Sequence, residues 1–125
     1  MRHLPKIYCE VIPHKKQRYD TAGDYFFGSW YNRWNFLISE MKNTDYEFLV
    51  LVHEIIEWHL TQKRGIKEED ITNFDIESKH PDPGTLKNAP YHKEHMFATK
   101  IEKQLAKELK INWNKYDKSF DKLKY

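Results

Sequence analysis

The sequence predicts one α+β domain in which a small antiparallel sheet packs against two long helices. Its first 40 residues contain three short β-prone segments, and the rest contains two long helical patterns. The length of 125 residues is typical of one compact domain. Aromatic residues make up 15% of the chain, a share that disordered chains lack. We therefore expect a single domain over residues 1–125, with the sheet at about 6–39 and the helical part at about 45–125.

The predicted strands lie between turn-forming residues. Residues 6–12 are rich in β-branched and aromatic side chains and end at Pro13. Residues 25–27 and 34–38 have the composition of two further strands, and residues 28–32 would turn between them. The pattern predicts a hairpin beside an N-terminal strand.

The first long helix is predicted over residues 45–64. Thr44 or Asp45 can cap its start, and Gly65 lies where it would end. Apolar side chains cover most of its circumference, which is typical of a helix buried in a core.

The second long helix is predicted over residues 90–110, with Asn88 as its cap. His95 lies on its apolar face, and Glu102 lies at the edge of that face two turns further on. Aromatic residues at helical spacing within 113–125 predict a short amphipathic helix at the end of the chain.

The residues best suited to chemistry lie on the first helix, in the string His53-Glu54-Ile55-Ile56-Glu57. At about 100° per residue, Glu57 lies about 40° around the axis from His53, and Glu54 lies about 100° from it. An imidazole and a carboxylate four residues apart can hold one divalent ion. Glu54 would act as the general base toward water at that ion. This is the logic of the H-E-x-x-H zinc helix, with glutamate in place of the second histidine.

We expect His95 to supply the missing histidine, because antiparallel packing of the two helices would bring it toward His53 and Glu57. Glu102 or Asp75 would complete the metal shell or bind the outer nitrogen of a histidine ring. Zinc is the expected ion, and a carboxylate-rich shell suits manganese or iron as well. The resulting hypothesis is a metal-dependent, peptidase-like hydrolase with an unknown substrate.

A structural role is the alternative for the same residues. Histidine and glutamate four residues apart often form only a local pair, and a buried polar network can balance its own charges. The protein would then be a non-enzymatic accessory protein with a structural metal or no metal. It would bind a protein partner, with the aromatic side chains around Trp113 and Tyr116 as contact surface. An open coordination position in a cleft would distinguish the enzyme from a closed structural site.

Charge and composition argue against several other classes of protein. Lysine and arginine number 21 against 19 aspartates and glutamates, and this near balance argues against a nucleic-acid or membrane-surface binder. No apolar run approaches the roughly 20 residues that span a bilayer, and no secretory signal follows the N-terminus. Cys9 is the only cysteine, so we expect a reducing compartment, the cytoplasm. The substrate and the oligomeric state stay open at this point.

Parts of the sequence resemble a family of small hypothetical proteins encoded by phages and prophages, over about residues 7–116. The resemblance rests on Gln17, Arg18 and Tyr19 with Gly23 and Asp24, on 46–50 with the H-E-x-x-E string, and on 90–99 with Ile101 and Glu102. It implies a phage or mobile-element context inside a host cell. The H-E-x-x-E helix beside a small sheet also resembles a minimal zincin, which implies a peptidase-like zinc site.

Overall fold

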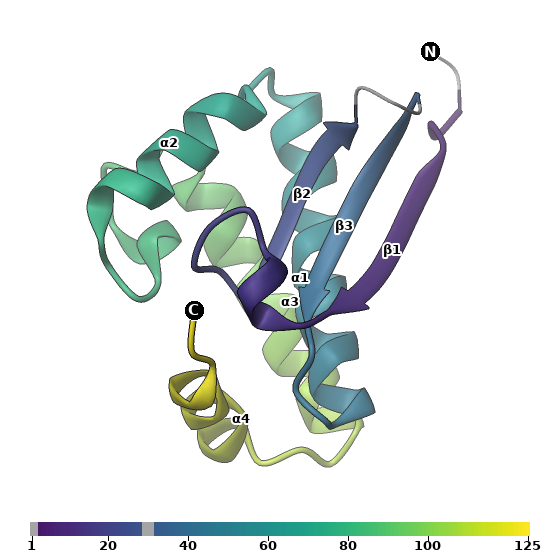
Figure 1. Cartoon of the computed structure of the whole chain (residues 1–125), viewed down its shortest axis with the longest axis vertical. Helices are drawn as coiled ribbons and strands as arrows, with labels where there is room; N and C mark the ends of the chain where they lie inside the picture. Colours follow the sequence, from purple (N-terminus) through teal and green to yellow (C-terminus); the bar gives the residue numbers. More distant parts are fainter. Residues whose placement is uncertain (1–2, 29–31) are drawn as a thin grey trace.

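The computed structural model describes residues 3–28 and 32–125, and its α+β fold confirms the predicted class (Figure 1). The strands are β1 (Ile7–Ile12), β2 (Gly23–Gly28) and β3 (Arg33–Ser39). The helices are α1 (Thr44–Lys63), α2 (Glu68–Ser78), α3 (His92–Glu108) and α4 (Trp113–Ser119). Short 3₁₀ turns are η1 (His14–Lys16), η2 (Pro83–Thr85) and η3 (Phe120–Lys122). Most of the turn predicted at 28–32 falls outside the described residues.

The sheet has the strand order β1-β3-β2. β2 and β3 pair antiparallel, with Tyr25 opposite Phe36, so the predicted hairpin is confirmed. β1 runs parallel to β3, with Cys9 opposite Phe36. The prediction of a wholly antiparallel sheet is therefore wrong for β1. β3 is the central strand, and it carries three deeply buried residues, Phe36, Ile38 and Ser39.

Helix α1 covers one face of the sheet, and α3 packs against α1 (Figure 1). Trp58 of α1 joins Tyr25 and Phe36 of the sheet in one buried cluster. Arg64, just after α1, forms an ion pair with Glu94 near the start of α3 at 2.6 Å, so the two helices run antiparallel. The buried side chains of α1 are therefore covered partly by the sheet and partly by α3.

α1 is not buried on all sides, contrary to the prediction. Phe48 is 46% exposed and His59 is also exposed, while Leu49 is fully buried. The small sheet and α3 leave part of the helix surface to solvent, because three strands are too narrow to enclose a helix. No helix in the described part of the chain has the length and apolar character needed to cross a membrane.

The helix ends lie close to the predicted positions, but the caps differ. Asn43 caps α1, since its Oδ1 accepts a hydrogen bond from the Tyr46 N–H at 3.0 Å. α3 begins at His92 without a side-chain cap, so the prediction of Asn88 as its cap is wrong. The loop before α3 contacts other parts of the protein, and these contacts position the first residues of the helix. No side-chain cap does so.

Candidate metal centre

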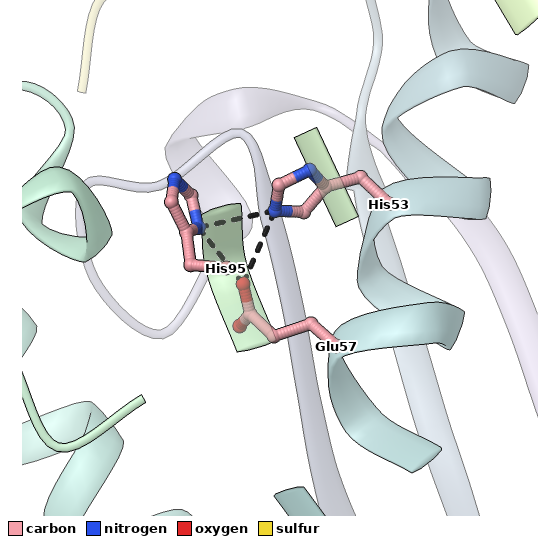
Figure 2. Close-up of side chains that lie close together, drawn as sticks. All are labelled: His53, Glu57 and His95. Atoms are coloured by element: carbon pink, nitrogen blue, oxygen red, sulfur yellow. Dashed lines mark hydrogen bonds and ion pairs between the residues drawn. The ribbon is translucent and has the colours of Figure 1, made fainter. Parts of the chain in front are cut away.

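α1 and α3 bring three metal-binding side chains face to face at their interface (Figure 2). His53 and Glu57 lie one turn apart on α1, and His95 faces them from α3. His53 Nε2 lies 3.1 Å from Glu57 Oε2 and 3.1 Å from His95 Nδ1. His95 Nδ1 lies 2.9 Å from Glu57 Oε2. All three residues are buried, with exposed fractions of 4 to 8%.

The triangle formed by these three atoms fits a tetrahedral ion. Zinc binds histidine nitrogen and carboxylate oxygen at roughly 2.0–2.1 Å, which keeps neighbouring donor atoms about 3.3 Å apart. The observed separations of 2.9 to 3.1 Å are slightly shorter. A small outward movement of the side chains would therefore seat an ion, and the group could hold a divalent metal.

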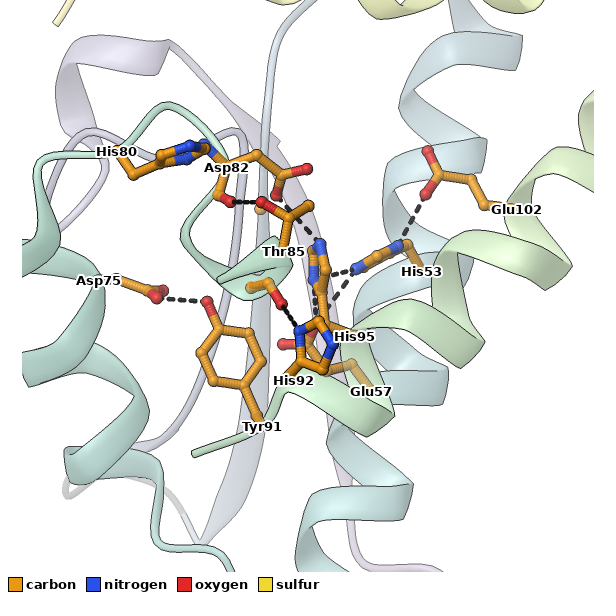
Figure 3. A network of polar contacts seen from close by, with 12 residues as sticks. His53, Glu57, Asp75, His80, Asp82, Thr85, Tyr91, His92, His95 and Glu102 are labelled. Carbon is orange, nitrogen blue, oxygen red and sulfur yellow. Dashed lines mark hydrogen bonds and ion pairs between the residues drawn. The ribbon is translucent and has the colours of Figure 1, made fainter. Parts of the chain in front are cut away.

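Carboxylates also meet the outer nitrogens of both rings (Figure 3). Glu102 Oε1 lies 2.7 Å from His53 Nδ1. Asp82 Oδ1 lies 3.0 Å from His95 Nε2, in an ion pair that lacks the alignment of a hydrogen bond. These carboxylates favour a proton on each outer nitrogen, which leaves the two inner nitrogens as lone pairs facing Glu57. Carboxylate–histidine pairs of this kind orient the histidine ligands of metal sites.

Protons would balance the charges of the site whenever no ion is bound. Burial lowers the pKa of His53, but hydrogen bonds with Glu102 and Glu57 outweigh it and raise this pKa well above its usual value. Burial likewise lowers the pKa of His95, and contacts with Asp82 and Glu57 raise it to about 9. Two protonated rings would then lie 4.7 Å apart, centroid to centroid, and share one carboxylate. A divalent ion would relieve this repulsion, because the two protons would be replaced by one doubly charged ion placed between the three donor atoms.

Two tyrosines fix the carboxylates of the site. The Tyr25 hydroxyl, from β2, donates to Glu57 Oε1 at 2.9 Å. The Tyr116 hydroxyl, from α4, donates to Glu102 Oε2 at 2.5 Å. Tyr25 and Asp82 were not found from the sequence, because they come from other elements and have no fixed spacing from the H-E-x-x-E string. Tyr116 was expected in a contact surface, but that prediction is wrong because its side chain is fully buried.

Glu54 lies beside the three donors, on the wall of a cavity of about 590 Å³ that also reaches them. No described residue forms a hydrogen bond or ion pair with its carboxylate. Burial raises the pKa of Glu54 well above its usual value, and the charge on Glu57 raises it further. Gly23 leaves the room for this side chain, since a Cβ there would lie 2.7 Å from Glu54 Cγ. An unpaired carboxylate in such a place suits proton transfer.

Asp75 lies elsewhere on the cavity wall, apart from the three donors that face one another. It accepts a short hydrogen bond from the Tyr91 hydroxyl and another from the Tyr19 hydroxyl at 2.9 Å. Burial raises its pKa to about 6, although both phenols act in the opposite direction. Asp75 thus lies on α2, in the wall of the cavity. Of the two carboxylates expected to complete the site, Glu102 is the one that contacts a ligand ring.

The candidate site therefore consists of a buried His53-Glu57-His95 group that could hold a metal ion, with Glu54 next to it on a cavity. Comparison of the chain with protein-family models, with curated proteins and with solved structures gives no match. The resemblance to phage-encoded proteins and to zincins therefore stays a prediction.

Proposed function

We propose that this protein is a metal-dependent hydrolase in which His53, Glu57 and His95 hold a divalent ion, with zinc as the first candidate. One observation carries the proposal: the three donor atoms face one another at the wall of a cavity. An ion held there would have an open side toward a substrate, as catalytic zinc sites do. Among the described residues, no fourth histidine, cysteine or carboxylate belongs to this group of facing donors.

The chain supplies the acid–base chemistry that hydrolysis needs. A bound divalent ion provides a Lewis acid that polarises a carbonyl group and lowers the pKa of water. Glu54 accepts the proton that water loses as it attacks, and then delivers that proton to the leaving group. Its unpaired carboxylate beside His53, on the cavity wall, supports this role.

The remaining residues hold the ligands in place and bound the substrate. Glu102 and Asp82 orient the two rings through their outer nitrogens. Tyr25 fixes the Glu57 oxygen that faces away from the histidines. The cavity has the volume of a site for a short peptide or another small ligand. A peptide amide accords with the H-E-x-x-E helix, so the proposal is a peptidase-like hydrolase.

A partner-binding accessory protein is the second candidate, and a specific observation favours it. Glu57, Glu102 and Asp82 can neutralise both histidines without any ion. Such a network would be a structural feature of the α1–α3 interface. The protein would then act through its surface, in the phage or prophage context that the sequence resemblance implies.

Metal content separates the two candidates. The protein is purified tag-free without chelators and analysed by elemental mass spectrometry, beside His53→Ala, His95→Ala and His59→Gln. His59 lies exposed on α1, so its variant is a matched control for the loss of a histidine from the same helix. We expect about one equivalent of a transition metal in the wild type and the control, and none in the other two variants. A protein that contains no metal and takes up none when zinc, manganese or iron is offered would overturn the hydrolase proposal.

A further inference from the structure

The cavity beside the metal centre gathers negative charge. Ten of the chain's nineteen aspartates and glutamates line it. Among the described residues on its wall, Lys118 stands alone as a lysine or arginine, although the chain has 21 of them. The nearly neutral chain is thus strongly polarised, with an acidic cavity and a basic remainder.

Positive charges near the wall do not cancel this excess. Arg18 binds Asp24 through two hydrogen bonds of 2.7 and 2.8 Å, and Glu68 through one of 2.9 Å. A divalent ion, Arg18 and Lys118 would supply four positive charges against the nine carboxylates other than Glu54. His14 lies 2.8 Å from one of these nine, Asp20. A bound substrate would therefore meet a negative surface even in the metal-loaded protein.

Three carboxylates that line the cavity have no cation bound to them in the described part of the chain. Asp75 is partly buried, and tyrosine hydroxyls bind its carboxylate. Asp117 and Asp121 lie exposed on α4 and η3, and neither forms an ion pair with another described residue. They line the same cavity as His53, Glu57 and His95, so a molecule bound there would lie near them.

We propose that this site takes a cationic substrate: a peptide segment that carries lysine or arginine side chains. The inference rests on the proposed hydrolase function and deepens it by naming the substrate class. A cleft with walls of one sign focuses its field and concentrates ligands of the opposite sign. Phosphoesters and nucleic acids would be repelled by the same walls.

Hydroxamates of capped amino acids test this inference without requiring turnover. They bind a catalytic metal through the hydroxamate group, so three of them can differ in side-chain charge alone. We would titrate the zinc-loaded protein with the hydroxamates of N-acetyl-lysine, N-acetyl-glutamine and N-acetyl-glutamate in a calorimeter. At low salt, the lysine compound should bind on the order of tenfold more tightly than the glutamate compound. The ratio should shrink at 1 M salt, where the Debye length falls to about 3 Å.

A pair of charge reversals locates the effect in the cavity. Asp117→Lys/Asp121→Lys changes the rim without touching a metal ligand, so zinc content should be unchanged. The preference for the lysine compound should fall severalfold or reverse. Glu40→Lys/Glu108→Lys is the matched control, because these exposed glutamates do not line the cavity and the total change of charge is the same. The control should keep the wild-type preference.

The outcomes separate failure of this inference from failure of the proposed function. If none of the three hydroxamates binds zinc-loaded protein, the metal has no open side and the hydrolase proposal fails. If they bind but the glutamate compound binds as tightly as the lysine compound, the function stands and the cationic preference is wrong. An equal change of preference in both double variants would also overturn the inference, since the cavity would then not be its source.

Discussion

Glu54 differs from the other carboxylates around the metal centre because no described residue binds it. Glu57 contacts two histidines and Tyr25, and Glu102 contacts His53 and Tyr116. Those two glutamates are fixed as acceptors, whereas the carboxylate of Glu54 is free to exchange a proton. This difference supports Glu54 as the residue of the chemical step.

Replacement of Glu54 by glutamine should separate metal binding from catalysis. Glutamine keeps the size of the side chain but cannot accept a proton, so Glu54→Gln should retain about one equivalent of metal. Hydrolysis of a lysine-containing fluorogenic peptide should fall by roughly 10²- to 10⁴-fold. Zinc content and rate are measured on the same sample, with Glu108→Gln as the control at an exposed position. Full activity of the metal-loaded Glu54→Gln protein would remove Glu54 from the mechanism.

At the scale of elements, the loop with η2 acts as a clamp on α3 (Figure 3). A Cβ atom at Gly84 would lie 2.3 Å from His95 Cγ, so the loop backbone rests directly on the imidazole ring. The Gly84 carbonyl accepts a hydrogen bond from His92 Nδ1 at 2.9 Å, which ties the loop to the same helix. Asp82, two residues earlier, meets the outer nitrogen of the ring. The loop therefore sets the orientation of His95, one of the three proposed metal ligands.

Gly84→Ala should impair this clamp. The added methyl group must displace His95 or the loop, so zinc affinity should fall by at least about tenfold, as it does when the groups that orient a ligand are lost. Titration calorimetry with zinc measures the effect, and thermal unfolding measures the accompanying loss of stability.

Gly65→Ala provides the control for a general loss of stability. Gly65 has a φ of +73°, and a Cβ added there would meet no atom within 4 Å. Alanine at this position should therefore cost about 1 kcal/mol of stability, because of its left-handed backbone, without reaching the site. The clamp is refuted if both alanine variants bind zinc as tightly as the wild type.

At the scale of the whole molecule, protons and the proposed metal ion would compete for the same histidine nitrogens at the α1–α3 interface. Contacts with carboxylates raise the pKa of His95 to about 9 and that of His53 well above its usual value. A raised histidine pKa contributes stability that is complete below the unfolded-state value of about 6.5. That contribution is lost as the pH rises through the folded-state value. The metal-free protein should therefore lose stability between about pH 6.5 and pH 9.

Metal binding should have the opposite dependence on pH. The inner nitrogens must be deprotonated to bind an ion, so zinc affinity should increase from pH 6 to pH 9. The difference in unfolding temperature between zinc-loaded and metal-free protein should grow over the same interval. Differential scanning calorimetry at a series of pH values measures both trends. A zinc affinity that is constant from pH 6 to pH 9 would contradict this account of the site.

Much of the local structure was predictable from the sequence. The helix predicted at 45–64 occupies Thr44–Lys63, and the helix predicted at 90–110 contains His92–Glu108. The pairing of His53 with Glu57 followed from helical spacing, and the choice of His95 as a nearby partner followed from antiparallel packing. These features depend on neighbours within about four residues or on apolar faces that must be covered.

Tertiary structure alone decided the rest. β1 runs parallel to β3 because its last residue, Ile12, lies opposite Ser39 at the end of the sheet where β2 begins, and this depends on the path of residues 13–22 and not on the side-chain pattern of β1. Tyr25 reaches Glu57 across 32 positions of sequence, and Glu102 reaches His53 across 49. The net charge of only +2 did not indicate an acidic cavity. Its carboxylates come from most elements of the chain and lie together only in the folded protein. The spacing of apolar residues indicates which side of a helix is buried. The partners of a buried polar group depend on how separate layers pack together in space.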